Sequence, residues 1–122
     1  MKANLHLHSR ISDGTEWPAD VAVRAYRTGL EWVALTDHDT LGGLDEFQRA
    51  ALKLGLKTTA AVEIDCSAPE IGYRSELLAY FPQGRYEHTK ALLGEVTKRR
   101  LEYVRSSIRK AQRHFVKSQV SF

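Results

Sequence analysis

The sequence is poor in cysteine and has no long apolar run. Cys66 is the one cysteine in 122 residues, which excludes an internal disulfide framework and a cysteine-rich zinc site. No apolar stretch approaches the roughly 18–20 residues that a membrane span needs, and the first ten residues lack the apolar core of a secretory signal. A reducing compartment is the default for such a chain. We therefore expect a cytoplasmic protein without a membrane segment.

The composition is that of an ordinary globular domain, but the charge is unevenly distributed. Hydrophobic residues make up 43% and charged residues 27%, which excludes disordered, collagen-like and coiled-coil chains, and the length allows one small domain. The net charge of +3 divides into +7 over residues 98–122 and −4 over residues 1–97. We expect a motif-bearing α/β part over 1–83 and a basic amphipathic helix over 85–117.

The spacing of apolar residues predicts strands alternating with helices. Strands are predicted over 3–8, 31–36, 57–65 and 73–81 from short apolar or alternating runs. A first helix is expected to begin at Pro18 and end before Gly29, and a second to begin near Leu44 and end before Gly55. Strand–helix–strand order at this pitch predicts an α/β fold with parallel strands.

Histidines and carboxylates follow the predicted strands at the points where active sites form in parallel α/β folds. His6 and His8 share one side of the first strand because residues i and i+2 face the same way, and His38 follows the second strand. Packing such groups together is costly unless a cation offsets their charge and desolvation. Histidine with carboxylate suits zinc, manganese or iron more than calcium. The candidate ligands are His6, His8, Asp13, His38, Glu63 and Glu76.

The motifs HLHSRISDG, ALTDHDTLGG, AAVEID and ELLAYF, in this order over residues 3–81, resemble the N-terminal half of the PHP (polymerase and histidinol phosphatase) family. The resemblance implies a distorted, TIM-like (β/α)7 barrel, of which this chain would form a part, with up to three divalent metal ions at its rim. By position, His6 and His8 match ligands of one metal and Glu63 matches a carboxylate that bridges two metals.

The same resemblance assigns the remaining rim residues. Asp13 and His38 match ligands of a third metal. Asp37 and Asp39 match acids that contact the ligands and do not themselves bind the metal. The family usually has a histidine where this chain has Glu76. A carboxylate there would favour manganese or magnesium over zinc.

The family also supplies a later histidine and a terminal Asp-x-His that do not occur in this sequence. A two-ligand site rarely holds a metal firmly, and a barrel does not close with four strands. We therefore expect either a fragment of a longer protein or an incomplete PHP domain that is completed by self-association or by a complementing chain. In both cases the 122-residue chain alone would bind at most one or two metals.

The basic helix admits three interpretations. Its charged face is solvated while an apolar stripe packs on the domain, or Arg99 or Arg100 contacts a substrate phosphate, or the stripe binds a partner. The stripe consists of Leu101, Val104, Ile108, Ala111 and Phe115.

The leading functional hypothesis is a metal-dependent phosphoesterase. It would hydrolyse a small phosphate monoester, or a nucleotide or oligonucleotide phosphate, through a metal-activated water. The alternative is a non-catalytic metal-binding or assembly module. A PHP domain associated with a DNA polymerase is a third hypothesis, which the short chain disfavours.

Overall fold

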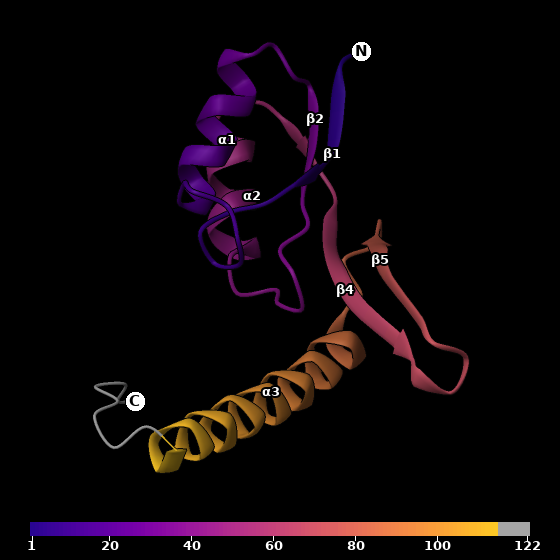
Figure 1. Cartoon of the computed structure of the whole chain (residues 1–122). Coiled ribbons are helices and arrows are strands. Elements are labelled where there is room, and N and C mark those ends of the chain that lie inside the picture. Colours follow the sequence, from indigo (N-terminus) through magenta and orange to yellow (C-terminus); the bar gives the residue numbers. More distant parts are fainter. Residues whose placement is uncertain (115–122) are drawn as a thin grey trace.

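The computed structural model describes residues 1–114, and a sheet of three parallel strands lies beside the first two helices (Figure 1). The strands are β1 (Ala3–Leu7), β2 (Trp32–Leu35) and β3 (Lys57–Thr58), which lie side by side in that order. The strands predicted over 3–8 and 31–36 are confirmed to within one residue at each end. The α/β class and the parallel pairing of this sheet are therefore as the sequence indicated.

Two helices cover one face of this sheet. They are α1 (Pro18–Arg27) and α2 (Leu44–Lys53), and both begin where the sequence predicted. Gly29 and Gly55 follow them with φ angles of 79° and 78°, the left-handed conformation in which glycine commonly ends a helix. The local signals thus fix both helix ends.

The hydrophobic core lies between the two helices and the parallel sheet. Phe47 on α2 is fully buried, as is Val33 on β2. Burial of such apolar side chains holds the two helices against this face of the sheet. The core cluster consists of Val21, Ala22, Ala25, Val33, Leu35, Phe47, Ala51 and Leu56.

The third and fourth predicted strands differ from the prediction. The strand expected over 57–65 is interrupted after β3 and resumes as β4 (Ala60–Ala68), which pairs antiparallel with β5 (Tyr73–Phe81). The expectation of parallel strands throughout is therefore wrong for β5. The physical reason is the connection, because η1 (Pro69–Ile71) and Gly72 join the two strands and a parallel crossover needs a dozen or more residues.

A single parallel bridge between His38 and Glu63 joins the hairpin to the parallel sheet. The backbone N–H of Asp39 donates to the carbonyl of Glu63 at 2.8 Å. The hairpin then projects away from α1 and α2 (Figure 1). The bridge places the start of β4 beside the end of β2, and so brings the second and third predicted motifs together.

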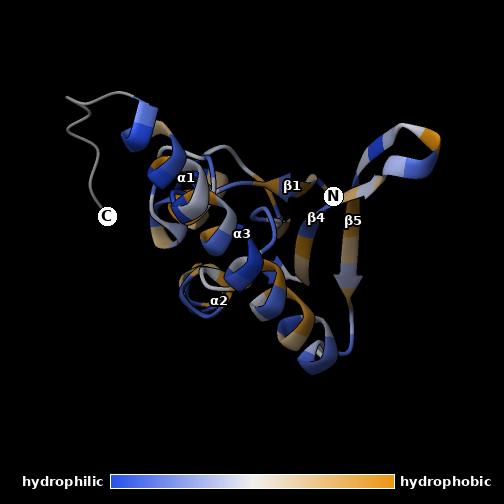
Figure 2. Ribbon diagram, turned by 60° about the horizontal axis from the view of Figure 1, so that its bottom comes forward, coloured by the Kyte–Doolittle hydropathy of each residue, from blue (hydrophilic) through white to orange (hydrophobic). Residues whose placement is uncertain are grey.

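The basic helix α3 (Glu87–His114) begins below β4, runs away from the hairpin and packs loosely (Figure 1). Leu93 is its one buried residue among those described, whereas Leu101 is 51% exposed and Val104 is 43% exposed. The expectation that this stripe packs on the domain is wrong for these two residues. Figure 2 shows hydrophobic and hydrophilic residues interspersed along the helix. The predicted helix also includes Phe115, Val116 and Lys117, which lie outside the described residues.

No helix within residues 1–114 has both the length and the apolar character that crossing a membrane requires. The longest helix, α3, is also rich in arginine and lysine.

Candidate metal centre

The centre is built around the carboxylate of Glu63, whose side chain is only 5% exposed. His6 Nε2 lies 2.8 Å from Glu63 Oε2 and His8 Nε2 lies 2.9 Å from the same oxygen. Both imidazoles come from β1 or the residue after it, and the i and i+2 spacing turns them to one side as predicted. One buried oxygen therefore meets two imidazole nitrogens.

A third imidazole, from the segment that follows β2, approaches the same oxygen. His38 Nε2 lies 3.7 Å from Glu63 Oε2 and 3.6 Å from Asp13 Oδ2. The ring of His38 stacks on that of His8, with centroids 4.8 Å apart. The loop after β1 thus brings Asp13 to the open side of the cluster.

The side chains form three overlapping groups whose candidate ligand atoms lie within 4.8 Å of one another. His8 belongs to two of the groups, and so does His38. A neutral imidazole ligates through one nitrogen while the other carries a proton, so the shared histidines do not complete every group at once. The groups are His6, His8 and Glu63; His8, Asp13 and His38; and His38, Asp65 and Glu76.

An unsatisfied buried nitrogen supports the fit of a cation here. His8 Nδ1 lies 3.2 Å from Asp13 Oδ1 but makes no hydrogen bond with it or with any other described atom. It is the one such buried side-chain atom within residues 1–114. An unpaired buried polar atom costs free energy, and imidazole with carboxylate is a donor set for a transition metal. The residues present therefore fit a divalent ion.

The charges around His38 also favour a cation in this cluster. Burial opposes the charged form and lowers its pKa, but the hydrogen bond with Asp65 and the nearby charge of Glu63 outweigh burial. The negative charge of Asp13 adds to this effect, so the pKa of His38 is raised above 6.5. The surrounding carboxylates thus stabilise positive charge at this point.

The predicted phosphate-contacting arginines differ in where they lie. Arg100 donates through Nη2 to Asp39, and the same atom is 3.3 Å from Asp65 Oδ2. Arg99 is exposed and takes no part in the described contacts of the rim. The structure therefore brings Arg100, and not Arg99, to the candidate site.

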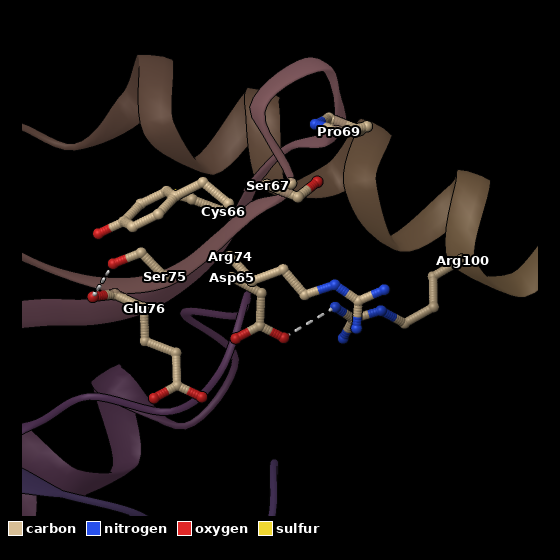
Figure 3. Close-up of a pocket in the computed structure, with 10 residues that line it drawn as sticks. Asp65, Cys66, Ser67, Pro69, Arg74, Ser75, Glu76 and Arg100 are labelled. Carbon is tan, nitrogen blue, oxygen red and sulfur yellow. Dashed lines mark hydrogen bonds and ion pairs between the residues drawn. The ribbon is translucent and has the colours of Figure 1, made fainter.

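A groove runs from the cluster between the β4–β5 hairpin and α3 (Figure 3). Its volume is about 950 Å³, and Asp65, Glu76, Arg74 and Arg100 line it. Glu76 lies opposite Asp65 in the β4–β5 pair and is exposed. The groove gives a solute access to the outer edge of the cluster.

A family model named PHP domain matches residues 4–120. The chain belongs to the PHP family. The predicted resemblance is therefore confirmed, and it extends over α3 as well as over the four motifs.

Curated relatives are similar to part of this chain. It is 44% identical over 63 residues to a 5′-3′ exoribonuclease of Haemophilus influenzae, covering 52% of this chain and 23% of the relative. It is 37% identical over 100 residues to an error-prone DNA polymerase of Cutibacterium acnes, covering 74% and 9%. It is 44% identical over 64 residues to a 3′,5′-nucleoside bisphosphate phosphatase of Chromobacterium violaceum, covering 52% and 22%.

The PHP chain also resembles solved structures along its whole length. A protein from Bifidobacterium adolescentis, assigned as a metal-dependent phosphoesterase, superposes with a TM-score of 0.78 at 28% identity. The superposition covers 100% of this chain and 41% of that protein. The chain thus spans less than half of the length of each relative named here.

Two acids of the second PHP motif are buried beside the cluster and accept hydrogen bonds. Asp37 is 2% exposed, and its oxygens accept hydrogen bonds from the backbone N–H of Ser9 at 2.7 Å and from the hydroxyls of Ser9 and Ser12 at 2.6 and 2.7 Å. Asp39 is 3% exposed and accepts from the backbone N–H of Asp65 at 3.0 Å. Their oxygens are occupied by donors, which agrees with the supporting position that the resemblance implied.

Sequence reasoning missed Asp65. It contacts His38 at 3.0 Å between Oδ1 and Nδ1 and belongs to the third group of candidate ligands. The signal was present, because Asp65 stands two residues after Glu63 in the same strand and so shares its face.

The loop after β1 is packed too tightly for a side chain at Gly14. A Cβ atom on Gly14 would lie 2.6 Å from the carbonyl oxygen of His8. We expect Gly14→Ala to displace the backbone of His8 and to weaken Mn²⁺ binding by about 10–100-fold, as the loss of a supporting contact does. Isothermal titration with Mn²⁺ measures this change.

The matched control is Gly94→Ala on α3, where a Cβ atom meets nothing within 4 Å. This variant should bind Mn²⁺ as the unchanged chain does, and alanine should stabilise the helix by up to about 1 kcal/mol. Equal affinities of the Gly14→Ala and unchanged chains would contradict the prediction.

Proposed function

We propose that this chain carries the N-terminal part of the active centre of a PHP-type metal-dependent phosphoesterase. The observation that carries the proposal is the convergence of three imidazoles on one buried oxygen of Glu63. Glu63 lies within β4 and is 4% exposed, and burying a carboxylate is costly unless a partner offsets its charge. A divalent cation would offset both the charge and the unsatisfied nitrogen of His8.

In this proposal different side chains bind different metal ions. His6, His8 and Glu63 hold one ion, and Asp13 with His38 contributes to another. When bound, such ions activate water near neutral pH and offset charge on phosphoryl oxygens. Glu76 adds an exposed carboxylate, a hard oxygen ligand that favours Mn²⁺ or Mg²⁺ over zinc or iron at that edge.

The proposed substrate is a phosphate ester, and a nucleotide or oligonucleotide phosphate is favoured. By their names, the exoribonuclease and the nucleoside bisphosphate phosphatase act on esters of this class, and each matches 52% of this chain at 44% identity. The groove beside the cluster is lined by Arg74 and Arg100. Both described contacts of Arg100 use Nη2, and a guanidinium has five N–H donors, so others are available to an anion.

We further propose that the described strands form part of a distorted (β/α)7 barrel, as in the family, with 1–122 as one incomplete domain. The exposed residues Leu101 and Val104 on α3 are where further elements, from the rest of a longer protein, a second copy or a complementing chain, would pack. A non-catalytic module is the alternative. The match to an error-prone DNA polymerase over 100 residues keeps a polymerase-associated domain as another candidate.

Removing a central ligand should abolish hydrolysis. With p-nitrophenyl phosphate and added Mn²⁺, we expect turnover that chelator removes and that His8→Ala or Glu63→Gln lowers by more than about 100-fold, since even supporting residues cost 10–100-fold. Release of p-nitrophenolate, followed at constant pH, measures the rate.

The control is His88→Ala, because His88 is exposed on α3 and belongs to none of the three ligand groups; its rate should match that of the unchanged chain. Mn²⁺ binding without turnover would support the non-catalytic module. Turnover that survives in Glu63→Gln would refute the proposed centre.

Arg100 and Arg99 form a matched pair for testing phosphate recognition. We expect Arg100→Ala to raise KM about tenfold or more, because a charged hydrogen bond contributes about 1.5–3 kcal/mol. Arg99→Ala should change KM by less than about twofold, since Arg99 makes no contact at the rim. Initial rates over a range of substrate concentrations give both values, and equal effects would indicate only a general attraction of the basic helix for anions.

The shared histidines limit the number of ions. We expect the 122-residue chain to retain at most two equivalents of Mn²⁺, because His8 and His38 each belong to two groups and each ligates through one nitrogen. Native mass spectrometry after buffer exchange counts the bound ions. Three equivalents that stay bound would show this expectation to be wrong.

A further inference from the structure

Asp65 has two carboxylate oxygens with two different partners. Oδ1 lies 3.0 Å from His38 Nδ1, and Oδ2 lies 3.3 Å from Arg100 Nη2. Figure 3 shows the Asp65 side chain reaching toward Arg100 across the groove. Both oxygens therefore face donors supplied by other elements, namely the end of β2 and the middle of α3.

The contact at Nδ1 decides which nitrogen of His38 is free. A carboxylate only accepts, so the hydrogen bond places a proton on His38 Nδ1. In the neutral ring the lone pair is then on Nε2, the atom that lies 3.6 Å from Asp13 Oδ2 and 3.7 Å from Glu63 Oε2. The ligating nitrogen is thus turned toward the cluster, in the arrangement by which a carboxylate orients a metal-binding histidine.

Asp65 is itself held in place from two sides. Its backbone N–H donates to Asp39 Oδ1 at 3.0 Å, and Asp39 is 3% exposed. Arg100 donates to both carboxylates through one nitrogen. A side chain fixed in this way and facing an arginine is poorly placed to bind a second cation, because the two positive charges would repel each other.

We propose that Asp65 is a positioning residue that fixes the tautomer and direction of His38, and that it is not a ligand of a third metal. Arg100 holds the second oxygen and links α3 to the rim. The consequence for metal binding rests on the proposed function above, whereas the tautomer of His38 does not.

The first test reads the tautomer in the apo chain. Long-range ¹⁵N–¹H spectra at about pH 9, where imidazole is neutral, should show the Nδ1–H form of His38. Asp65→Ala should lose that form in favour of Nε2–H or a mixture. Asp65→Asn should retain it, because the amide oxygen still accepts, and Asp20→Asn, at an exposed acid of α1, is the matched control. An unchanged His38 tautomer in Asp65→Ala would overturn the proposal.

The second test measures the number of bound Mn²⁺ ions and their affinity by titration of the same variants. Asp65→Asn should bind as many equivalents as the unchanged chain, and Asp65→Ala should bind about 10–100-fold more weakly. Loss of one whole equivalent in Asp65→Asn, with the tautomer retained, would identify Asp65 as a ligand and overturn the proposal. If no chain binds Mn²⁺, the proposed function fails while the spectra still decide what Asp65 does.

Discussion

The structure depends on one buried charge, the carboxylate of Glu63. Moving an isolated carboxylate out of water costs several kcal/mol or more, and Glu63 is 4% exposed. Its oxygen is compensated by His6 and His8, which come from β1. The bridge between His38 and Glu63 joins β4 to the end of β2. Three segments far apart in the sequence must therefore meet for this charge to be tolerated, and their meeting is what creates the candidate centre.

Much of the first half of the chain follows from local signals in the sequence. Pro18 opens α1, and Gly29 and Gly55 follow the helices with positive φ; each signal acts within a few residues. The histidine and carboxylate motifs were likewise located because strand ends in a parallel sheet share one edge. The structure brings all six predicted ligands into its three groups, although their binding of metal is still a prediction.

The errors arise where non-local contacts decide the outcome. The run over 57–65 is apolar throughout its middle, and nothing local marks the change of partner from β2 to β5. The periodicity of apolar residues correctly predicted that α3 is a helix. It did not predict which part of the protein its apolar face contacts, because amphipathicity indicates only that one face is suited to burial. Leu101 is therefore exposed in spite of its place in a regular apolar stripe.

The carboxylates in this centre differ in the atoms that they face, and therefore in what they can bind. Asp37 accepts three hydrogen bonds from the loop after β1 and so shapes that loop. Asp65 faces one imidazole and one guanidinium, while Glu63 faces imidazole nitrogens alone. Sequence spacing brings a carboxylate to a rim, but the number and kind of donors around each oxygen decide whether it is left to bind a cation. By that criterion the proposed metal ligand is Glu63, whereas Asp37 is occupied by donors from the loop after β1 and Asp39 by Asp65 and Arg100.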